Sequence, residues 1–157
     1  MTYTNFKRDL IIGEDGEVDV SVFLTDHGFS EISFNKDKFW DVRGRSPRTG
    51  MLTDFEIKTD IYCKCKKTDT GNIAVEIRYR DNPSGVSSST ADYFVYYFIH
   101  LKKNNLWFIS MDDLRMFIKK NIKDLKVVKG GDNSWSELVL IPRRKYFKHF
   151  NVYTFKY

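Results

Sequence analysis

The chain has few of the residues that cross-link or bend a polypeptide, with two Cys, three Pro and nine Gly among its 157 residues. Cys63 and Cys65 stand two positions apart, and no second Cys or His pair lies at zinc-binding spacing. This pattern argues against a disulfide framework and a zinc site, so we expect two reduced thiols on a strand. The histidines are scattered along the chain, and we expect structural roles for His27, His100 and His149.

Long apolar runs are also absent. No segment approaches the roughly 18 to 20 apolar residues that a membrane-spanning helix needs. The first ten residues, MTYTNFKRDL, lack the apolar run of a signal peptide. We therefore expect a cytoplasmic protein with no membrane partner.

The hydrophobic content of 41% suits one globular domain at this length. We expect a single domain over residues 1–157. Within it we expect an N-terminal arm at residues 1–10 and a basic, aromatic C-terminal segment at residues 142–157.

Charge is divided unevenly along the chain. Residues 1–60 carry 8 Lys/Arg against 12 Asp/Glu, a net of −4, whereas residues 61–157 carry 18 against 9, a net of +9. Early carboxylates suit a cation site, and late bases suit contact with a polyanion, although a solvated basic tail has the same composition. The candidate nucleic-acid contacts are bases of the C-terminal segment and hydroxyls of the loop at residues 81–90: Ser84, Ser87, Arg143, Arg144, Lys145 and Lys148.

Two helices follow from local patterns. Residues 13–28 have the spacing of an amphipathic helix, with Val18, Val22 and Leu24 on one side and acids in the first turn. A second helix begins after Ser110, which is a good N-terminal cap.

Alternating and apolar runs predict the strands at residues 39–43, 51–65, 73–80, 93–101, 106–110 and 135–142. The strands at 51–65 and 73–80 most simply pair as neighbours across the turn between them. The run at 93–101 has no polar face, which predicts burial on both sides. This order indicates an α/β (α+β) core with a mixed β-sheet.

Charged residues alternate along the strand at residues 51–65. Side chains two apart in a strand project to the same side about 6.5 to 7 Å apart, so Glu56 and Lys58 share a face. A carboxylate beside a lysine can hold a divalent cation and orient a water. Asp41 on the preceding strand and Glu17 in the first helix are natural further ligands. An exposed antiparallel face has the same alternation, so spacing alone leaves both interpretations open.

The series Glu17, Asp41 and Glu56-Ile57-Lys58 resembles the PD-(D/E)XK nuclease superfamily, whose sites combine a helix glutamate, a strand aspartate and an acid-x-Lys pair. The segments EIKTD, TGNIAVEI and NPSGVSSSTADYFVYY follow in the order found in small phage and bacterial PD-(D/E)XK-like proteins, including resolvase-like ones. SMDDLRMFIKKN and GGDNSWSELVLIP also fit that group, so the resemblance covers residues 10–145.

The resemblance implies a restriction-endonuclease-like core in which helices flank the mixed sheet. It makes Asp41 and Glu56 ligands of Mg²⁺ or Mn²⁺, with the Ile57 carbonyl as a possible further ligand. Lys58 becomes the residue that positions the attacking water or stabilises the charge that develops on the phosphorus centre. Glu17 would complete or support the ligand set. Three further polar positions of the group are expected to orient the ligands: Asp60, Asn72 and Glu76.

Departures from the family pattern leave alternatives open. Glu14 could take the place of Glu17, and no proline precedes Asp41. In a competing register Asp54 is the strand aspartate and Glu76-Ile77-Arg78 is the acid-x-base pair. That register has an arginine where lysine is usual, and arginine is effectively always protonated.

The resemblance implies a divalent-metal-dependent DNA endonuclease that hydrolyses phosphodiester bonds, with structure-specific cleavage as one form. It also suggests a phage-encoded protein that acts inside a host cell. Small nucleases of this superfamily often work as dimers, so a homodimer stays open. The alternatives are a non-catalytic nucleic-acid-binding protein on the same fold and a phage assembly or interaction protein whose carboxylates form a solvated face.

Overall fold

The computed structural model describes residues 3–35, 39–62, 67–99, 103–130 and 134–155. Cys63, Cys65 and His100 lie outside these residues. Within the described ranges the elements are α1 (Tyr3–Asp26), β1 (Ser30–Phe34), β2 (Val42–Arg45), β3 (Leu52–Asp60), β4 (Asn72–Tyr79), β5 (Asn82–Pro83), the 3₁₀ turn η2 (Gly85–Ser87), β6 (Tyr93–Phe98), β7 (Asn104–Ser110), α2 (Met111–Asn121), β8 (Lys126–Gly130), β9 (Ser136–Pro142), α3 (Arg143–Tyr146), the 3₁₀ turn η4 (Phe147–His149) and β10 (Asn151–Phe155).

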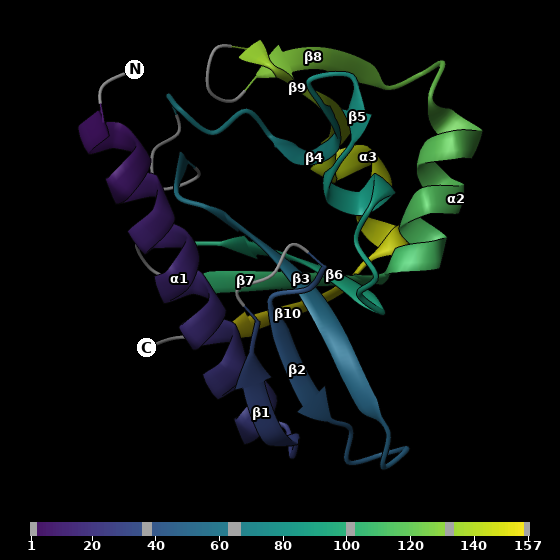
Figure 1. Cartoon of the computed structure of the whole chain (residues 1–157). Coiled ribbons are helices and arrows are strands. Elements are labelled where there is room, and N and C mark those ends of the chain that lie inside the picture. The colour runs from purple at the N-terminus through teal and green to yellow at the C-terminus, as the bar shows by residue number, and fades with distance from the viewer. Residues whose placement is uncertain (1–2, 36–38, 63–66, 100–102, 131–133, 156–157) are drawn as a thin grey trace.

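Two β-sheets form the centre of the molecule. The mixed sheet has the strand order β1-β2-β3-β6-β7-β10, in which β3 runs parallel to β6 and the other neighbours are antiparallel. The second sheet is antiparallel, with the order β5-β4-β9-β8. Figure 1 shows α1 along one side of the molecule and α2 on the other. The predicted α/β core with a mixed sheet and flanking helices is confirmed.

β6 is buried on both faces, as its apolar sequence predicted. Phe94, Tyr96 and Phe98 join the core between the two sheets and α2. Val95 and Tyr97 point to the other face and join the core beneath α1. No residue of this group is more than 4% exposed, because each face of the strand is covered by a different layer.

β3 and β4 do not pair, contrary to the sequence prediction. β3 lies between β2 and β6, whereas β4 pairs with β5 and β9. Ile73 and Val75 on β4 are fully buried in the core between the sheets. The doubly buried β6 therefore takes the place beside β3, and β4 covers one face of that arrangement from a separate sheet.

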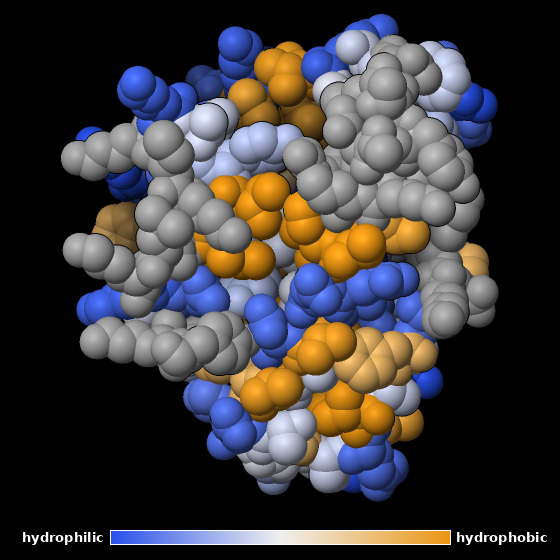
Figure 2. Space-filling view, turned by 90° about the vertical axis from the view of Figure 1, so that its left-hand side faces the viewer, coloured by the Kyte–Doolittle hydropathy of each residue, from blue (hydrophilic) through white to orange (hydrophobic). Residues whose placement is uncertain are grey.

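α1 begins at Tyr3 rather than at residue 13, so residues 3–10 belong to the helix instead of an arm, and its first turn carries no acid. Val20 and Leu24 face the mixed sheet and are 0% and 2% exposed. Val18 and Val22 are 52% and 47% exposed, so the predicted inward side was wrong for these two residues. Figure 2 shows hydrophobic residues gathered in patches on the side of the molecule that α1 borders.

The N-terminus of α2 lies where the sequence predicted it. Ser110 caps α2, since its side chain accepts a hydrogen bond from the Asp113 N–H at 3.1 Å. The C-terminal segment forms α3, a 3₁₀ turn and β10, and β10 pairs with β7, so this segment is part of the fold. No helix within the described ranges has both the length and the apolar character needed to cross a membrane.

Candidate active site

Three carboxylates from separate parts of the chain lie near one another beside β3. Glu56 is on β3, Asp41 directly precedes β2, and Glu17 is near the middle of α1. The charges of Asp41 and Glu56 both raise the pKa of Glu17, and the charge of Asp41 raises the pKa of Glu56. The charges of the three acids that the sequence singled out therefore act on one another.

The pairing at the beginning of β2 explains how Asp41 comes to lie beside β3. Val42 pairs with Phe55, and the Asp41 N–H donates to the Phe55 carbonyl at 2.9 Å. β2 begins at Val42, so the residues before Asp41 do not extend this strand along β3. The Ile57 N–H of β3 donates instead to Asp41 Oδ2 at 2.6 Å. The Asp41 side chain therefore replaces a further strand residue and is held against β3.

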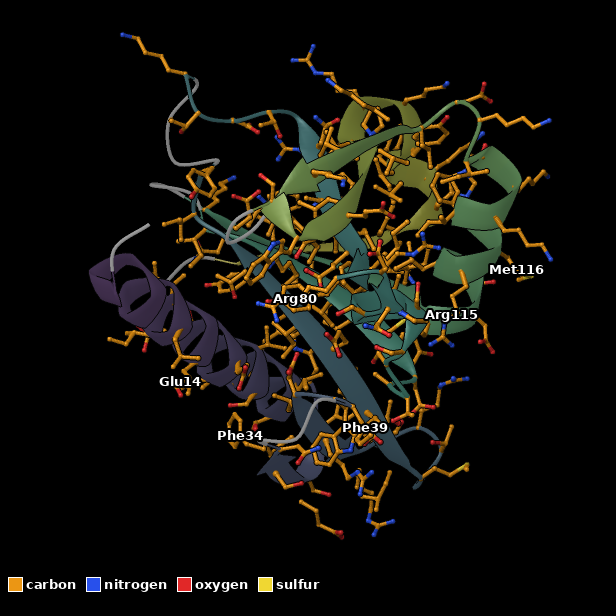
Figure 3. All side chains as sticks on the ribbon, turned by 45° about the horizontal axis from the view of Figure 1, so that its top comes forward. Glu14, Phe34, Phe39, Arg80, Arg115 and Met116 are labelled. Carbon is orange, nitrogen blue, oxygen red and sulfur yellow. The ribbon has the colours of Figure 1, made fainter. Side chains whose placement is uncertain are left out.

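Glu56 is held from the opposite side by the loop that precedes β6. Ser89 Oγ lies 3.0 Å from Glu56 Oε2 and 3.0 Å from the Phe39 carbonyl, and it can donate to either. Arg115 on α2 donates to the Val86 carbonyl at 2.9 Å and to the Ser89 carbonyl at 2.5 Å. Figure 3 shows β3 running between α1, which carries Glu14, and α2, which carries Arg115. Arg115 therefore fixes the loop whose hydroxyl contacts Glu56.

Burial and mutual repulsion shift the acids of this cluster. Burial is the largest cause that raises the pKa of Glu17 to about 7, followed by the charges of Asp41, Glu14 and Glu56. Burial also raises the pKa of Glu56 to about 7, followed by the charge of Asp41, while Lys58 acts in the opposite direction. Near neutral pH, each of these carboxyls would therefore be protonated in a large fraction of the molecules, unless a positive charge stabilises the ionised form.

Asp41 and Lys58 complete the cluster. Burial raises the pKa of Asp41, although the Ile57 N–H and the charge of Lys58 both act to lower it. Lys58 is exposed, and it lines a pocket of about 560 Å³ together with Gly13 on α1 and residues of β4 and β9. Its ammonium group can thus reach solvent or a ligand while its charge acts on the acids.

Gly16 brings α1 close to β3. A Cβ at position 16 would overlap Thr59 Oγ1, so only glycine allows the helix to pass the strand at this distance. Glu17 follows directly, and the close approach therefore fixes where Glu17 stands relative to Glu56.

Asp54 has a different environment from Glu56. Arg43 donates to both of its oxygens, with Nε to Oδ1 at 2.5 Å and Nη2 to Oδ2 at 2.7 Å. The same guanidinium lies over the Trp40 ring, with 4.4 Å to its centroid. The Asp54 charge is therefore compensated by a protein cation.

Glu76, the other residue of the competing register, lies on β4 in the second sheet. Its Oε1 accepts a hydrogen bond from Ser84 Oγ at 2.6 Å, and its charge contributes to the raised pKa of Glu56. Arg78 forms an ion pair with Glu137 at 3.6 Å. Glu76 thus borders the acid cluster, while Arg78 is engaged with β9.

The donor set suits a hard cation. Among the side chains that the structure describes, no three His, Cys, Asp or Glu lie close enough together to surround a metal ion. Asp41 and Glu56 supply two half-buried carboxylates, and the Ile57 N–H donates to Asp41. Mg²⁺ prefers oxygen ligands and is often held by one or two carboxylates while it keeps several waters. These two carboxylates could therefore hold Mg²⁺ or Mn²⁺ only together with waters or other oxygen ligands.

The candidate nucleic-acid contacts differ in their exposure. Ser84 is engaged with Glu76, and Arg143 pairs with Asp69 and lies over the Phe98 ring at 4.5 Å from its centroid. The remaining four are exposed: Ser87, Arg144, Lys145 and Lys148. Arg143 and Arg144 line a groove of about 1080 Å³ that shares Thr70 and Asn72 with the pocket of Lys58.

Sequence reasoning missed the contacts that Ser89 and Arg115 make beside Glu56. Ser89 belongs to the hydroxyl-rich loop at residues 81–90, which was a visible signal, although it pointed to phosphates instead of Glu56. Arg115 lies on a helix, and nothing in the local sequence indicates that its side chain reaches a loop 26 residues earlier.

No family model and no curated protein matches this chain. Its fold, however, is shared with a solved nuclease structure. That structure is the bacterial homing endonuclease I-Ssp6803I, with a TM-score of 0.51 over 89% of this chain and 86% of that chain. The sequence identity is 19%, so the similarity establishes the shared fold and leaves membership of the PD-(D/E)XK superfamily a prediction.

Proposed function

We propose that this protein is a nuclease that hydrolyses phosphodiester bonds of DNA and depends on Mg²⁺ or Mn²⁺. The observation that carries the proposal is the clustering of Glu17, Asp41 and Glu56 around β3, next to the exposed Lys58. The fold shared with a homing endonuclease favours DNA as the substrate. Perturbed acids gathered at one place are typical of a catalytic site.

Asp41 and Glu56 would hold the metal ion, with the Ile57 carbonyl as a further oxygen ligand. When bound, the ion supplies positive charge to the scissile phosphate and lowers the pKa of a bound water. Glu17 would support this ligand set from α1. The Ile57 N–H orients Asp41, and Ser89 Oγ orients Glu56.

Lys58 acts on the substrate side of the cluster. Its ammonium group would orient the attacking water and stabilise the negative charge that develops on the phosphate oxygens. The exposed bases Arg144, Lys145 and Lys148 would contact the DNA backbone beyond the site.

Asp41 is the favoured strand aspartate, and Asp54 is not. Both oxygens of Asp54 are engaged by Arg43, so a metal ion would have to displace an existing ion pair. Among the described residues, Asp41 instead accepts a hydrogen bond from the Ile57 N–H and is influenced by the charge of the exposed Lys58, so a metal ion could bind it without breaking an ion pair like that of Asp54.

The proposal is tested by incubating the purified protein with supercoiled, linear and branched DNA, with and without Mg²⁺ or Mn²⁺. We expect metal-dependent cleavage that falls by a factor on the order of 10³ in Glu56→Gln and Lys58→Ala, because each removes several kcal/mol of charge stabilisation. Lys67→Ala, an exposed lysine on the turn before β4, is the matched control and should cleave at the parental rate.

Parental rates in folded Glu56→Gln and Lys58→Ala would contradict the site assignment. Salt-dependent DNA binding without cleavage under either metal would instead support the non-catalytic alternative.

A further inference from the structure

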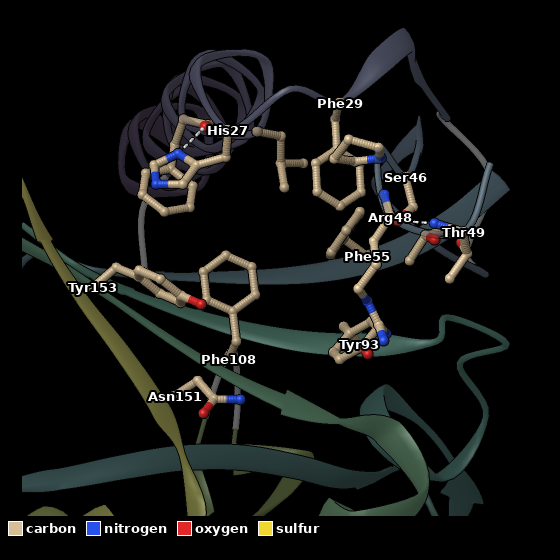
Figure 4. A pocket seen from close by; sticks show the side chains of 14 residues that line it. His27, Phe29, Ser46, Arg48, Thr49, Phe55, Tyr93, Phe108, Asn151 and Tyr153 are labelled. Carbon is tan, nitrogen blue, oxygen red and sulfur yellow. Dashed lines mark hydrogen bonds between the residues drawn. The ribbon is translucent and has the colours of Figure 1, made fainter. Parts of the chain in front are cut away.

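A further cavity lies on the face of β3 opposite Glu56. Its volume is about 340 Å³, and it opens between the C-terminal end of α1, the loop that joins β2 and β3, β7 and β10 (Figure 4). Phe55 lines this cavity, and the neighbouring Glu56 projects to the other face of the strand, as alternation in a strand requires. The cavity is therefore separate from the acid cluster.

Residues with aromatic rings make up half of the cavity lining. Phe55 stacks with Tyr93 at 5.8 Å between ring centroids and meets the edge of Phe108 at 6.3 Å. Phe108 in turn lies 5.5 Å from Tyr153, which is 43% exposed at the mouth. Phe29 lies 5.7 Å from Phe55 on the opposite side. The rings support one another and leave faces and edges directed at the open space, which suits a planar aromatic guest.

The polar part of the lining has one sign of charge. The lining contains no Asp or Glu, and its permanent cation is Arg48 on the loop between β2 and β3. Figure 4 shows the Arg48 side chain extending into the cavity toward Tyr93. Four residues of the lining add hydroxyl or amide groups that can hydrogen-bond: Ser46, Thr49, Thr53 and Asn151.

Arg48 differs from the other arginines of the same hairpin. Arg43 is bonded through two nitrogens to Asp54, and Arg45 is bonded in the same way to Glu31. The guanidinium of Arg48 has no hydrogen bond, ion pair or ring contact with any residue that the structure describes. An uncompensated guanidinium at an aromatic cavity favours a carboxylate or phosphate, since its donors match their oxygens.

We infer that this cavity binds a planar aromatic ring that carries an anionic group, the chemistry of a nucleoside monophosphate. The ring occupies the open space that Phe55, Tyr93 and Phe108 border, and the phosphate meets Arg48. Ligand sites generally enclose about 300 to 1,000 Å³, so this cavity holds one nucleotide and not a longer ligand. The inference does not depend on the proposed nuclease activity, because it uses none of the acids beside Lys58.

The test is calorimetric titration of the full chain with each nucleoside monophosphate, with the matched nucleosides, and with inorganic phosphate. We expect saturable binding of at least one nucleotide, with the nucleoside and the phosphate each at least about tenfold weaker. Arg48→Gln should weaken nucleotide binding by about 10- to 100-fold and leave nucleoside binding unchanged. Tyr153→Ala should weaken both ligands, whereas Lys119→Gln, an exposed charge change on α2, should alter neither.

A lack of saturable binding up to about 10 mM for every nucleotide would overturn the inference, since such affinities lie below those of a formed site. So would nucleotide binding that Arg48→Gln leaves unchanged, because this loop residue is exposed and its substitution does not disturb the core. Competition by a short single-stranded oligonucleotide would assign the site to a nucleotide within a strand, and lack of competition would assign it to free nucleotides. Both outcomes support the ring-and-anion chemistry.

Discussion

Folding moves the pKa values of Glu17 and Glu56 into the neutral range. Their pKa values rise to about 7, from 4.5 for an ordinary glutamate, chiefly because of burial. Between these two pH values the folded chain binds more protons than the unfolded chain, so the free energy of unfolding falls as pH rises. The stabilising contribution is fully present below pH 4.5 and is lost as pH passes through 7.

We predict that, without divalent ions, Glu56→Gln reduces this loss of stability between pH 5 and pH 8. The variant should unfold at a higher temperature than the parent at pH 8, by a few degrees, given that about 1 kcal/mol shifts the midpoint by roughly 2–4 °C at this size. Thermal unfolding of the parent and the variant at pH 5 and pH 8 measures this difference in midpoint temperature.

Glu31→Gln is the control, because Arg45 holds the pKa of Glu31 below its ordinary value. Its removal should not raise the midpoint at pH 8. A Glu56→Gln variant that is less stable than the parent at pH 8 would show that Glu56 is stabilised as a carboxylate.

At the scale of elements, α2 acts on the site through one loop. Arg115 holds the Val86 and Ser89 carbonyls, and Ser89 Oγ contacts Glu56. Arg115 touches neither the metal position nor the substrate, so it is a positioning residue.

We predict that Arg115→Gln lowers metal-dependent cleavage by about 10- to 100-fold and raises the Mg²⁺ concentration needed for half-maximal rate, the range expected when support of a ligand is lost. Lys120→Gln, an exposed residue of the same helix, should change neither quantity. A loss of cleavage with an unchanged metal requirement would limit Arg115 to a general structural role.

The contact of α1 with β3 depends on a single glycine. Ala favours a helix interior over Gly by about 1 kcal/mol, so an unopposed Gly→Ala change should stabilise α1. At Gly16 the added Cβ overlaps Thr59 Oγ1, whereas at Gly13 it meets nothing within 4 Å.

We therefore predict opposite effects for these two substitutions in denaturant unfolding. Gly13→Ala should raise the free energy of unfolding by up to about 1 kcal/mol, and Gly16→Ala should lower it by about 1–3 kcal/mol. Thr59→Ala should recover part of the loss in Gly16→Ala. Equal effects at both positions would mean that the helix moves away from β3 without cost.

Elements with local causes could be predicted from the sequence, and strand partners could not. The cap of α2 at Ser110 and the double burial of β6 depend on residues within one short stretch. The partner of β3 depends on the competition between β4 and β6, which lie at different distances along the chain. The inward side of α1 was missed at Val18 and Val22 because several apolar residues compete for it and packing on the mixed sheet selects Val20 and Leu24.

Part of the candidate site could be predicted from the sequence. Glu56 and Lys58 share a strand, and Asp41 directly precedes the strand before it, so alternation and spacing marked all three as candidates while an exposed surface strand stayed an alternative. The contacts of Ser89 and Arg115 join loops and helices through the fold, and Arg43 on Asp54 required the register of β2 with β3. Such contacts follow from tertiary packing, which no local pattern encodes.

At the scale of the whole molecule, the proposal requires acids that bind a metal ion and bases that bind DNA, and these lie in different parts of the chain. The first 60 residues carry a net charge of −4 and contain Glu17, Asp41 and Glu56, whereas the remainder carries +9. Arg144, Lys145 and Lys148 are exposed on the C-terminal part. A cluster of half-buried acids within a basic molecule can hold a cation and still attract a polyanion.

The most direct test of this account compares the Mg²⁺-dependent rate of DNA cleavage by Asp41→Asn with that of Asp54→Asn, each confirmed to be folded. Loss of a metal ligand removes several kcal/mol of transition-state stabilisation, so Asp41→Asn should lower the rate by a factor on the order of 10³. Asp54→Asn, which only loosens the pair with Arg43, should stay within about tenfold of the parent. A larger loss in Asp54→Asn than in Asp41→Asn would contradict the account.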